Sequence, residues 1–430
     1  MNEYAAMNIR SLPGADDTLR VVLDNGIIVL ARSNPESSSV VVNGYLQAGS
    51  MFETDEKAGL AQFTAAALMR GTQKRSFQQI FDALESAGAS LGFGSSVHTA
   101  SFGGRALAED LSLLLGLISE CVSQPVFPAE YIERLRAQTL TGLAIRAQDT
   151  ADMASLTFDK LLFPGHPYGR ADEGYPETVA AITHEDIIAF HRDHYGPTQM
   201  VVVVVGGVTP QAAVDQVQKA LGGFSNPGQV RPPVLPKIDP LPAELRQHVE
   251  IPGKSQADLL IGCLGPRRRS PDYMSASLGN NILGQFGMMG RIGDVVREQA
   301  GLAYYASTSL NSWIESGSWE VSAGVNPVNL ERATDLIIKE LKQYVKDGVS
   351  AEELQDSQAN FIGRLPLSLE SNNGVANALL NIERFQLGLD YYRLYPDQVA
   401  AVTAEQVLEA SRRYMNPECL VIVSAGSQAA

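Results

Sequence analysis

The fold of this chain is decided by residues 59–72, which read GLAQFTAAALMRGT. From Ala61 to Met69 almost every side chain is small or apolar, which predicts one short, buried helix. Gly59 precedes this helix and Gly71 ends it, as glycines just outside helix ends commonly do. The stretch contains no His, Asp, Glu or Cys, so none of its side chains is a good metal ligand or a proton carrier.

The composition is that of a folded chain with more than one domain. The sequence has 430 residues, of which 45% are hydrophobic and 19% are charged. A chain of this length exceeds one ordinary core, so we expect two or more domains. The formal net charge of −15 argues against nucleic acid or an anionic membrane surface as a partner, because either would repel the protein.

Three further features predict the compartment. Cys121, Cys263 and Cys419 lie far apart without a C-x-x-C pair, which suits a reducing environment, and we expect them to be buried. Residues 1–17 lack the basic and apolar regions of a signal peptide. The longest apolar run, residues 200–205, is far shorter than the about 20 residues of a membrane span. We therefore expect a soluble, cytoplasmic protein.

Hydrophobic periodicity predicts the main secondary-structure elements. Apolar residues recur at helical spacing over residues 76–87, 107–122, 128–146 and 151–162. The uniformly apolar run at 201–205 predicts a central strand instead, because it is too short for a buried helix.

A proline-rich stretch divides the chain. Residues 225–243 contain six prolines, which do not fit inside helices or central strands, so we expect an extended, semi-rigid linker there. This places an N-terminal domain at 1–224 and a C-terminal domain at 244–430.

The two halves are similar to each other. Residues 183–185 precede a strand that begins near residue 201, and residues 403–405 precede one that begins near residue 420. Residues 129–130 are matched by 351–352 at a similar offset of about 220 residues. Each half mixes strand pairs with long amphipathic helices. The sequence therefore predicts an α+β fold of two homologous domains that arose by internal duplication.

Motifs along the whole chain resemble those of the M16 metallopeptidases, the pitrilysin-like and mitochondrial-processing-peptidase-like family. Residues 59–72 resemble the family's zinc helix, G-L-A-H-F-x-E-H-x-x-x-x-G-T, and residues 163–169 resemble its F-x-x-H-P-[YL]-G loop. Residues 281–284 and 297–304 also match in the family's order. The resemblance implies two M16-type (LuxS/MPP-like) domains per chain, and two such chains that close as a clamshell around a peptide chamber.

The same resemblance implies a zinc site whose residues are absent here. In the family's frame the first His has become Gln62, the general-base Glu has become Ala65, and the second His has become Ala66. The distant Glu ligand falls at Gly142. Because such a site needs two imidazoles, a carboxylate and a free general base, we expect no metal in this chain.

Two other groups of polar residues have simpler interpretations. His191 and His194 are spaced to chelate a metal, but we expect a solvated helix face. Residues 267–269 read Arg-Arg-Arg, and we expect a solvated turn rather than a docking site for a peptide or partner.

A second family motif is intact. Arg297 and Tyr304 are seven residues apart, and the pattern predicts a helix ended by Gly301 and a strand from Leu302. From the residues alone, they read as a surface Arg and a half-buried Tyr. The resemblance implies that Tyr304 donates to the oxyanion at the scissile carbonyl and that Arg297 holds a neighbouring substrate carbonyl. Tyr305 would point to the opposite side of the strand.

These features together predict the non-catalytic subunit of a heterodimeric M16-type zinc metallopeptidase. Arg297 and Tyr304 would act in trans on peptide substrates, and the zinc and general base would belong to a homologous subunit with an intact H-x-x-E-H motif. The alternative is a catalytically inactive structural or peptide-binding M16-like protein, as a homodimer or a complex scaffold. In that case the pair would be a backbone clamp or a relic.

Overall fold

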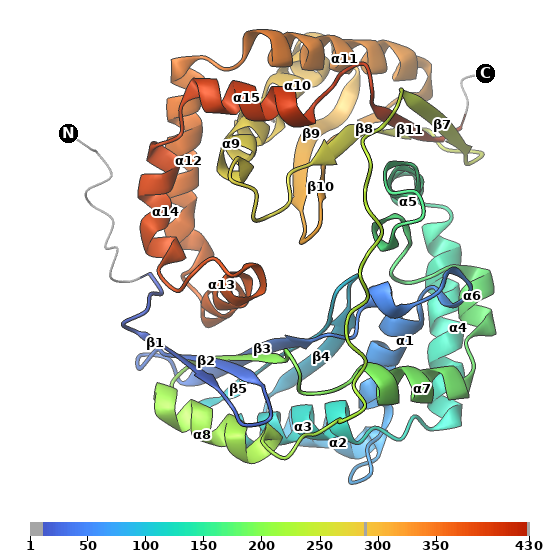
Figure 1. Cartoon of the computed structure of the whole chain (residues 1–430). Helices are drawn as coiled ribbons and strands as arrows, with labels where there is room; N and C mark the ends of the chain where they lie inside the picture. The colour runs from blue at the N-terminus through green and yellow to red at the C-terminus, as the bar shows by residue number, and fades with distance from the viewer. Residues whose placement is uncertain (1–11, 288–289, 428–430) are drawn as a thin grey trace. The chain divides into compact units, whose positions relative to one another are not determined.

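The computed structural model describes residues 12–287 and 290–427, which form two compact units (Figure 1). Unit 1 contains residues up to 143 together with 170–235 and 366–393, and unit 2 contains residues 144–169, 236–365 and those from 394 onward. Neither unit is continuous in sequence. Residues 224–244 form no helix or strand.

Unit 1 is built on a six-stranded sheet with the strand order β1-β2-β6-β3-β5-β4. Neighbouring strands are antiparallel except for β2 and β6, which are parallel. Every residue of β6 is buried, which confirms the predicted central strand at 201–205. The strands are β1 (Thr18–Val22), β2 (Ile28–Ser33), β3 (Ser39–Leu46), β4 (Ser90–Ser95), β5 (Ala100–Leu107) and β6 (Val201–Gly206).

Helices cover the apolar core of this sheet. The predicted helices at 76–87, 107–122 and 128–146 correspond to α2, α3 and α4, within a few residues at each end. The helices of unit 1 are α1 (Leu60–Ala67), α2 (Phe77–Ser86), α3 (Leu111–Ser123), most of α4 (Ala129–Arg146), α6 (Pro176–Ala181), α7 (His184–His194), α8 (Pro210–Leu221) and α13 (Asn372–Phe385).

Unit 2 repeats the arrangement with a five-stranded sheet in the order β7-β11-β8-β10-β9. Its strands are β7 (Leu245–Glu250), β8 (Ala257–Gly265), β9 (Ala303–Ser312), β10 (Gly317–Val325) and β11 (Val421–Gly426). Its helices are α5 (Thr150–Leu162), α9 (Tyr273–Gly284), α10 (Gly290–Gly293), α11 (Leu330–Asp347), most of α12 (Ala351–Ser368), most of α14 (Tyr391–Ala400) and α15 (Ala404–Tyr414).

The two sheets have one topology. In unit 1 the parallel pair β2–β6 is followed by the antiparallel neighbours β3, β5 and β4, and in unit 2 the parallel pair β7–β11 is followed by β8, β10 and β9. Each strand of the second series lies at the same place in its half as the matching strand of the first. The structure thus confirms the α+β class and agrees with an internal duplication.

The halves exchange one helix each. Helix α5 comes from the N-terminal half but packs against β8 and β11 of unit 2, and α13 comes from the C-terminal half but packs against β3 and β6 of unit 1 (Figure 1). Each exchanged helix covers equivalent strands, because a sheet buried on one face only would leave its central apolar strands open to water. The domain bounds predicted from the sequence, 1–224 and 244–430 with a linker at 225–243, assign α5 to the N-terminal half and α13 to the C-terminal half. They follow the order of the chain, whereas the two compact units follow its packing.

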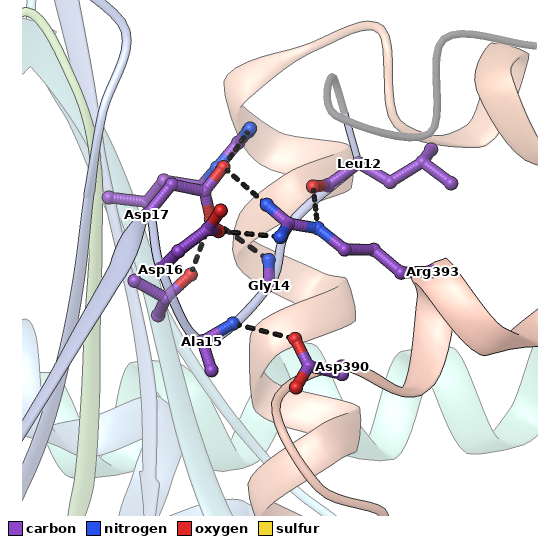
Figure 2. A network of polar contacts seen from close by, with 9 residues as sticks. Leu12, Gly14, Ala15, Asp16, Asp17, Asp390 and Arg393 are labelled. Atoms are coloured by element: carbon purple, nitrogen blue, oxygen red, sulfur yellow. Dashed lines mark hydrogen bonds and ion pairs between the residues drawn. The ribbon is translucent and has the colours of Figure 1, made fainter.

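A polar network holds the first described residues of unit 1 (Figure 2). The Arg393 guanidinium donates to the carbonyl oxygen of Leu12 at 3.0 Å and lies 2.6 Å from Asp16 Oδ1 and 3.4 Å from Asp17 Oδ2. The backbone N–H of Ala15 donates to Asp390 Oδ1 at 2.9 Å. These contacts attach the segment before β1 to residues 390–393, at the start of α14.

Two sequence expectations about surfaces can be compared with the fold. Within the part of the chain that the structure describes, no helix is both long enough and apolar enough to cross a membrane. Cys121 and Cys263 are buried as expected, whereas Cys419 is partly exposed. Burial raises the pKa of the Cys121 and Cys263 thiols to about 12, so neither is a reactive thiolate near neutral pH.

Candidate functional site

Helix α1 aligns with the family's zinc helix, and its side chains pack into the core of unit 1. Gln62 Oε1 accepts a hydrogen bond of 2.7 Å from the backbone N–H of Ser95, the last residue of edge strand β4. Ala65 is 1% exposed and belongs to the buried part of the helix, and Ala66 packs against the core. The one polar side chain at these three positions is therefore used to attach α1 to β4.

The position of the distant zinc ligand is also without a donor atom. Gly142 lies near the end of α4 on an exposed face, and a Cβ added there would meet no atom within 4 Å. The residues at these four positions do not fit a zinc ion, because two alanines, a glycine and a hydrogen-bonded amide supply neither imidazole nor carboxylate. Over residues 12–287 and 290–427, no three His, Cys, Asp or Glu side chains lie close enough together to hold a metal.

A buried acid that the sequence reading missed holds the start of α1. Glu53 accepts hydrogen bonds from the backbone N–H groups of Ala61 at 2.5 Å and Gly59 at 3.2 Å. Burial raises the pKa of the Glu53 carboxyl to about 8, and the hydrogen bonds and the Arg170 charge oppose this only in part. The sequence cue that could have indicated such an acid is the glycine at position 59, because the residue before α1 then has no side chain to cap the helix. In the structure Gly59 has φ +96°. A carboxyl group from the preceding loop caps the helix instead.

Arg297 lies on an irregular turn of unit 2. Residues Asp294–Gln299 (η8) are π-helical, with hydrogen bonds that span five residues instead of four. The turn ends at Gly301, which has φ +63°, and the N–H of Leu302 donates to the Val296 carbonyl at 3.0 Å. The Arg297 side chain is 35% exposed, and its Nε lies 3.7 Å from Glu298 Oε1. This neighbour is too distant for a strong bidentate pair, so the guanidinium can still engage a ligand.

Tyr304 lies at a β-bulge on the edge strand β9. Tyr305 is opposite Gly324 and Ala303 is opposite Val325, so Tyr304 has no partner residue on β10. Its side chain is 67% exposed, more than the half-buried tyrosine expected from composition. A bulge of this kind re-aims the side chain of the extra residue. The two residues of the intact motif thus lie on two consecutive irregularities of the backbone.

Tyr305 has a different environment from Tyr304. Its hydroxyl donates a hydrogen bond of 2.6 Å to Asp258 Oδ1, and the residue is half-buried. Burial and this hydrogen bond raise the pKa of Tyr305 well above its usual range. Tyr305 is therefore already committed within unit 2, in keeping with its exclusion from the motif.

The expectation for the two histidines of α7 was wrong. His191 Nε2 lies 2.9 Å from the Val122 carbonyl oxygen, and burial lowers the pKa of His191 to about 4. The His194 ring centroid lies 4.2 Å from that of Phe52. This helix face is packed inside unit 1 instead of being solvated, because α7 contacts α1 and the end of α3.

The arginine run at 267–269 borders a cavity of about 860 Å³ in unit 2. Arg267 is exposed, and Arg268 stacks on the Tyr273 ring at 4.0 Å. Two other lining arginines are already paired: Arg412 donates to the carbonyl oxygens of Val345 and Lys346, and Arg413 donates to Asp272 Oδ2. Arg412 therefore caps the C-terminal end of α11, and Arg413 neutralises Asp272.

Comparisons with known proteins agree with this geometry. Residues 28–161 match the family model described as insulinase (peptidase family M16), and residues 181–361 match the one described as the peptidase M16 inactive domain. An uncharacterized zinc protease of Streptomyces coelicolor, SCO5738, is 25% identical over 86% of this chain and 81% of its own length. The mitochondrial-processing peptidase subunit beta of Lentinula edodes is 24% identical over 94% of this chain and 89% of its own.

Solved structures extend the likeness to nearly the whole chain. The crystal structure titled peptidase M16 inactive domain from Pseudomonas fluorescens superposes with a TM-score of 0.90 at 27% identity, over 96% of this chain and 98% of that one. A protease from Helicobacter pylori shares the fold, with a TM-score of 0.89 at 19% identity over 96% and 100% of the two chains. With both M16 models matched in order and this fold shared end to end, the chain belongs to peptidase family M16.

Proposed function

We propose that this chain is the non-catalytic subunit of a heterodimeric M16-type zinc metallopeptidase. One contrast carries the proposal: α1 and α4 have no zinc ligand at the family positions, whereas a partly exposed Arg297 and an exposed Tyr304 lie on a π-turn and a β-bulge. Such irregularities cost backbone hydrogen bonds and occur frequently at functional sites.

The proposed reaction is hydrolysis of a peptide bond. Water adds to the scissile carbonyl carbon, the C–N bond breaks, and a general base on the partner passes the proton to the leaving nitrogen. Zinc, bound in the partner, supplies Lewis-acid activation. This chain contributes the Tyr304 hydroxyl, which donates a hydrogen bond to the carbonyl oxygen as negative charge develops on it, and the Arg297 guanidinium, which holds a neighbouring substrate carbonyl.

The partner in this proposal is a homologous M16 chain with an intact H-x-x-E-H motif. The proposed compartment is the cytoplasm, supported by three cysteines without a disulfide among the described residues.

The test is reconstitution with such a homologue from the same source. We expect the pair to cleave a fluorogenic peptide library and neither chain to do so alone. Tyr304→Phe should lower kcat by about 10²–10³, the usual cost of one oxyanion donor. Arg297→Ala should mainly raise KM, because it removes a contact present before the transition state.

Matched controls are available in unit 2. Tyr273→Phe removes a tyrosine hydroxyl but keeps the ring under Arg268, and Arg332→Ala removes an exposed arginine on α11. Both should leave the rate unchanged. If Tyr304→Phe and Arg297→Ala behave like these controls in an active complex, the proposed role is wrong.

The second candidate is a catalytically inactive structural or peptide-binding protein. The hydrogen bond between Ser95 and Gln62 favours this candidate, because it attaches α1, which lacks the zinc ligands, to strand β4 and so gives α1 a structural role. This candidate predicts that no homologue yields cleavage, that the chain forms a stable homodimer or joins a scaffold, and that peptides bind in a manner dependent on Arg297.

A further inference from the structure

Three residues on adjacent strands of unit 2 form a row beside Tyr304. Tyr305 on β9 is opposite Gly324 on β10, and Gly324 is in turn opposite Asp258 on β8. The Tyr305 hydroxyl donates to Asp258 Oδ1 at 2.6 Å. The tyrosine side chain therefore crosses the middle strand and joins the edge strand to the strand beyond it.

The middle position of the row has no room for a side chain. A Cβ added to Gly324 would lie 2.5 Å from Cε1 of Tyr305 and 2.8 Å from Nε2 of Gln256. Real Cβ atoms do not approach so closely, so any other residue would push the tyrosine ring away from β10. Glycine is required here for space and not for its backbone conformation. The Tyr305 ring covers this position, and the φ of Gly324 is not in the left-handed region.

The far end of the row is a buried carboxylate with several donors. Asp258 is 4% exposed and accepts hydrogen bonds from Gln256 Nε2 at 3.1 and 3.2 Å and from the Thr150 hydroxyl of α5, besides the one from Tyr305. A buried carboxylate is costly unless donors surround it, so each donor is held strongly. The Tyr305 hydroxyl consequently has one well-defined acceptor.

This row comes directly after the bulge. Tyr304 has no partner on β10, and β9 is an edge strand, so no further strand holds its other side. A bulge on an edge strand can slip by one residue, and such a slip moves every following side chain to the opposite face. The residue best placed to prevent the slip is Tyr305, because it is the first paired residue beyond the bulge.

We propose that Tyr305, Gly324 and Asp258 form a brace that fixes the bulge and thereby positions the Tyr304 hydroxyl. Tyr305 and Asp258 are positioning residues in this proposal, and neither touches substrate. The importance of Tyr304 rests on the proposed function, but the effect of the brace on Tyr304 does not.

The test uses the full chain with 3-fluorotyrosine incorporated at position 304 and ¹⁹F NMR. We expect one narrow resonance in the parent protein. Tyr305→Phe keeps the ring but removes the hydroxyl, and Gly324→Ala displaces the ring; both should shift the resonance or split it into several. Ser307→Ala is the matched control, because it removes a cross-strand hydrogen-bonding pair, Ser307 with Ser322, between the same two strands beyond the bulge. It should leave the resonance unchanged.

An unchanged resonance in folded Tyr305→Phe would overturn the brace. If that variant does not fold, the double variant Asp258→Asn with Tyr305→Phe removes the buried charge and keeps an amide oxygen as acceptor for the Gln256 and Thr150 donors. It should show the same shift, and an unshifted resonance there would also refute the proposal.

In the reconstituted peptidase, Tyr305→Phe should lower kcat on the order of 10-fold, less than full loss of the Tyr304 donor. If the resonance shifts but Tyr304→Phe leaves kcat unchanged, the proposed function is refuted and the brace is still supported.

Discussion

Replacing Glu53 by Gln should remove most of the pH dependence of stability of unit 1 near neutral pH. Glu53 is buried at the start of α1, accepts N–H groups from Ala61 and Gly59, and has its pKa raised from 4.5 to about 8. The folded protein therefore holds a proton here that the unfolded chain releases. The contribution is fully present below the unfolded pKa and is lost as the pH rises through the folded pKa.

The magnitude follows from the two pKa values. Between them the folded state binds one more proton than the unfolded state, so the free energy of unfolding falls by about 1.4 kcal/mol per pH unit, or about 3 kcal/mol from pH 5.5 to 7.5. Below about pH 6.5 two other groups contribute with opposite signs: Asp172, whose pKa burial raises to about 6, adds to this fall, and His191, whose pKa burial lowers to about 4, opposes it. Above pH 6.5 the slope should therefore be due mainly to Glu53.

The assay is urea unfolding of the parent and variant proteins at half-unit steps from pH 5.5 to 7.5. A Gln side chain has the shape of the protonated acid and accepts one of the two N–H groups through its carbonyl oxygen, so Glu53→Gln should give a nearly flat profile above pH 6.5. The control, Glu56→Gln, changes an exposed acid of the same loop and should keep the parent slope. A parent protein whose stability is flat or rises between pH 6.5 and 7.5 would refute the reasoning, as would an unchanged slope over that range in Glu53→Gln.

Two further predictions concern attachments within unit 1. Asn43→Ala should lower the free energy of unfolding, measured by urea unfolding, by about 2–3 kcal/mol. The Asn43 amide donates to two asparagine side chains of α13, at 3.0 and 2.9 Å, and both acceptors would lose it. The comparison is Asn381→Ala, which changes an exposed asparagine of the same helix. Arg393→Ala should speed amide hydrogen exchange over residues 14–18 without changing exchange in β6, because it removes the contacts to Leu12 and Asp16. Equal protection in both proteins would show that the network in Figure 2 does not hold this segment.

Local sequence features predicted much of the fold because they depend on neighbours in the chain. The apolar run at 201–205 became the buried central strand β6, and the periodic segments became α2 to α5. The repeated patterns of the halves agree with two sheets of one topology. The missing ligand residues at 62, 65, 66 and 142 and the presence of Arg297 and Tyr304 could be read directly, since side-chain identity needs no structure.

Features that depend on distant parts of the chain were decided by the tertiary structure alone. The exchange of α5 and α13, the capping of α1 by Glu53 and the burial of His191 all involve partners that no local pattern indicates. The bulge that exposes Tyr304 is likewise a matter of register between β9 and β10. The sequence by itself determined which chemical groups this protein has and lacks. Packing between remote segments decided which of them are exposed, because burial and strand register depend on every element that meets there.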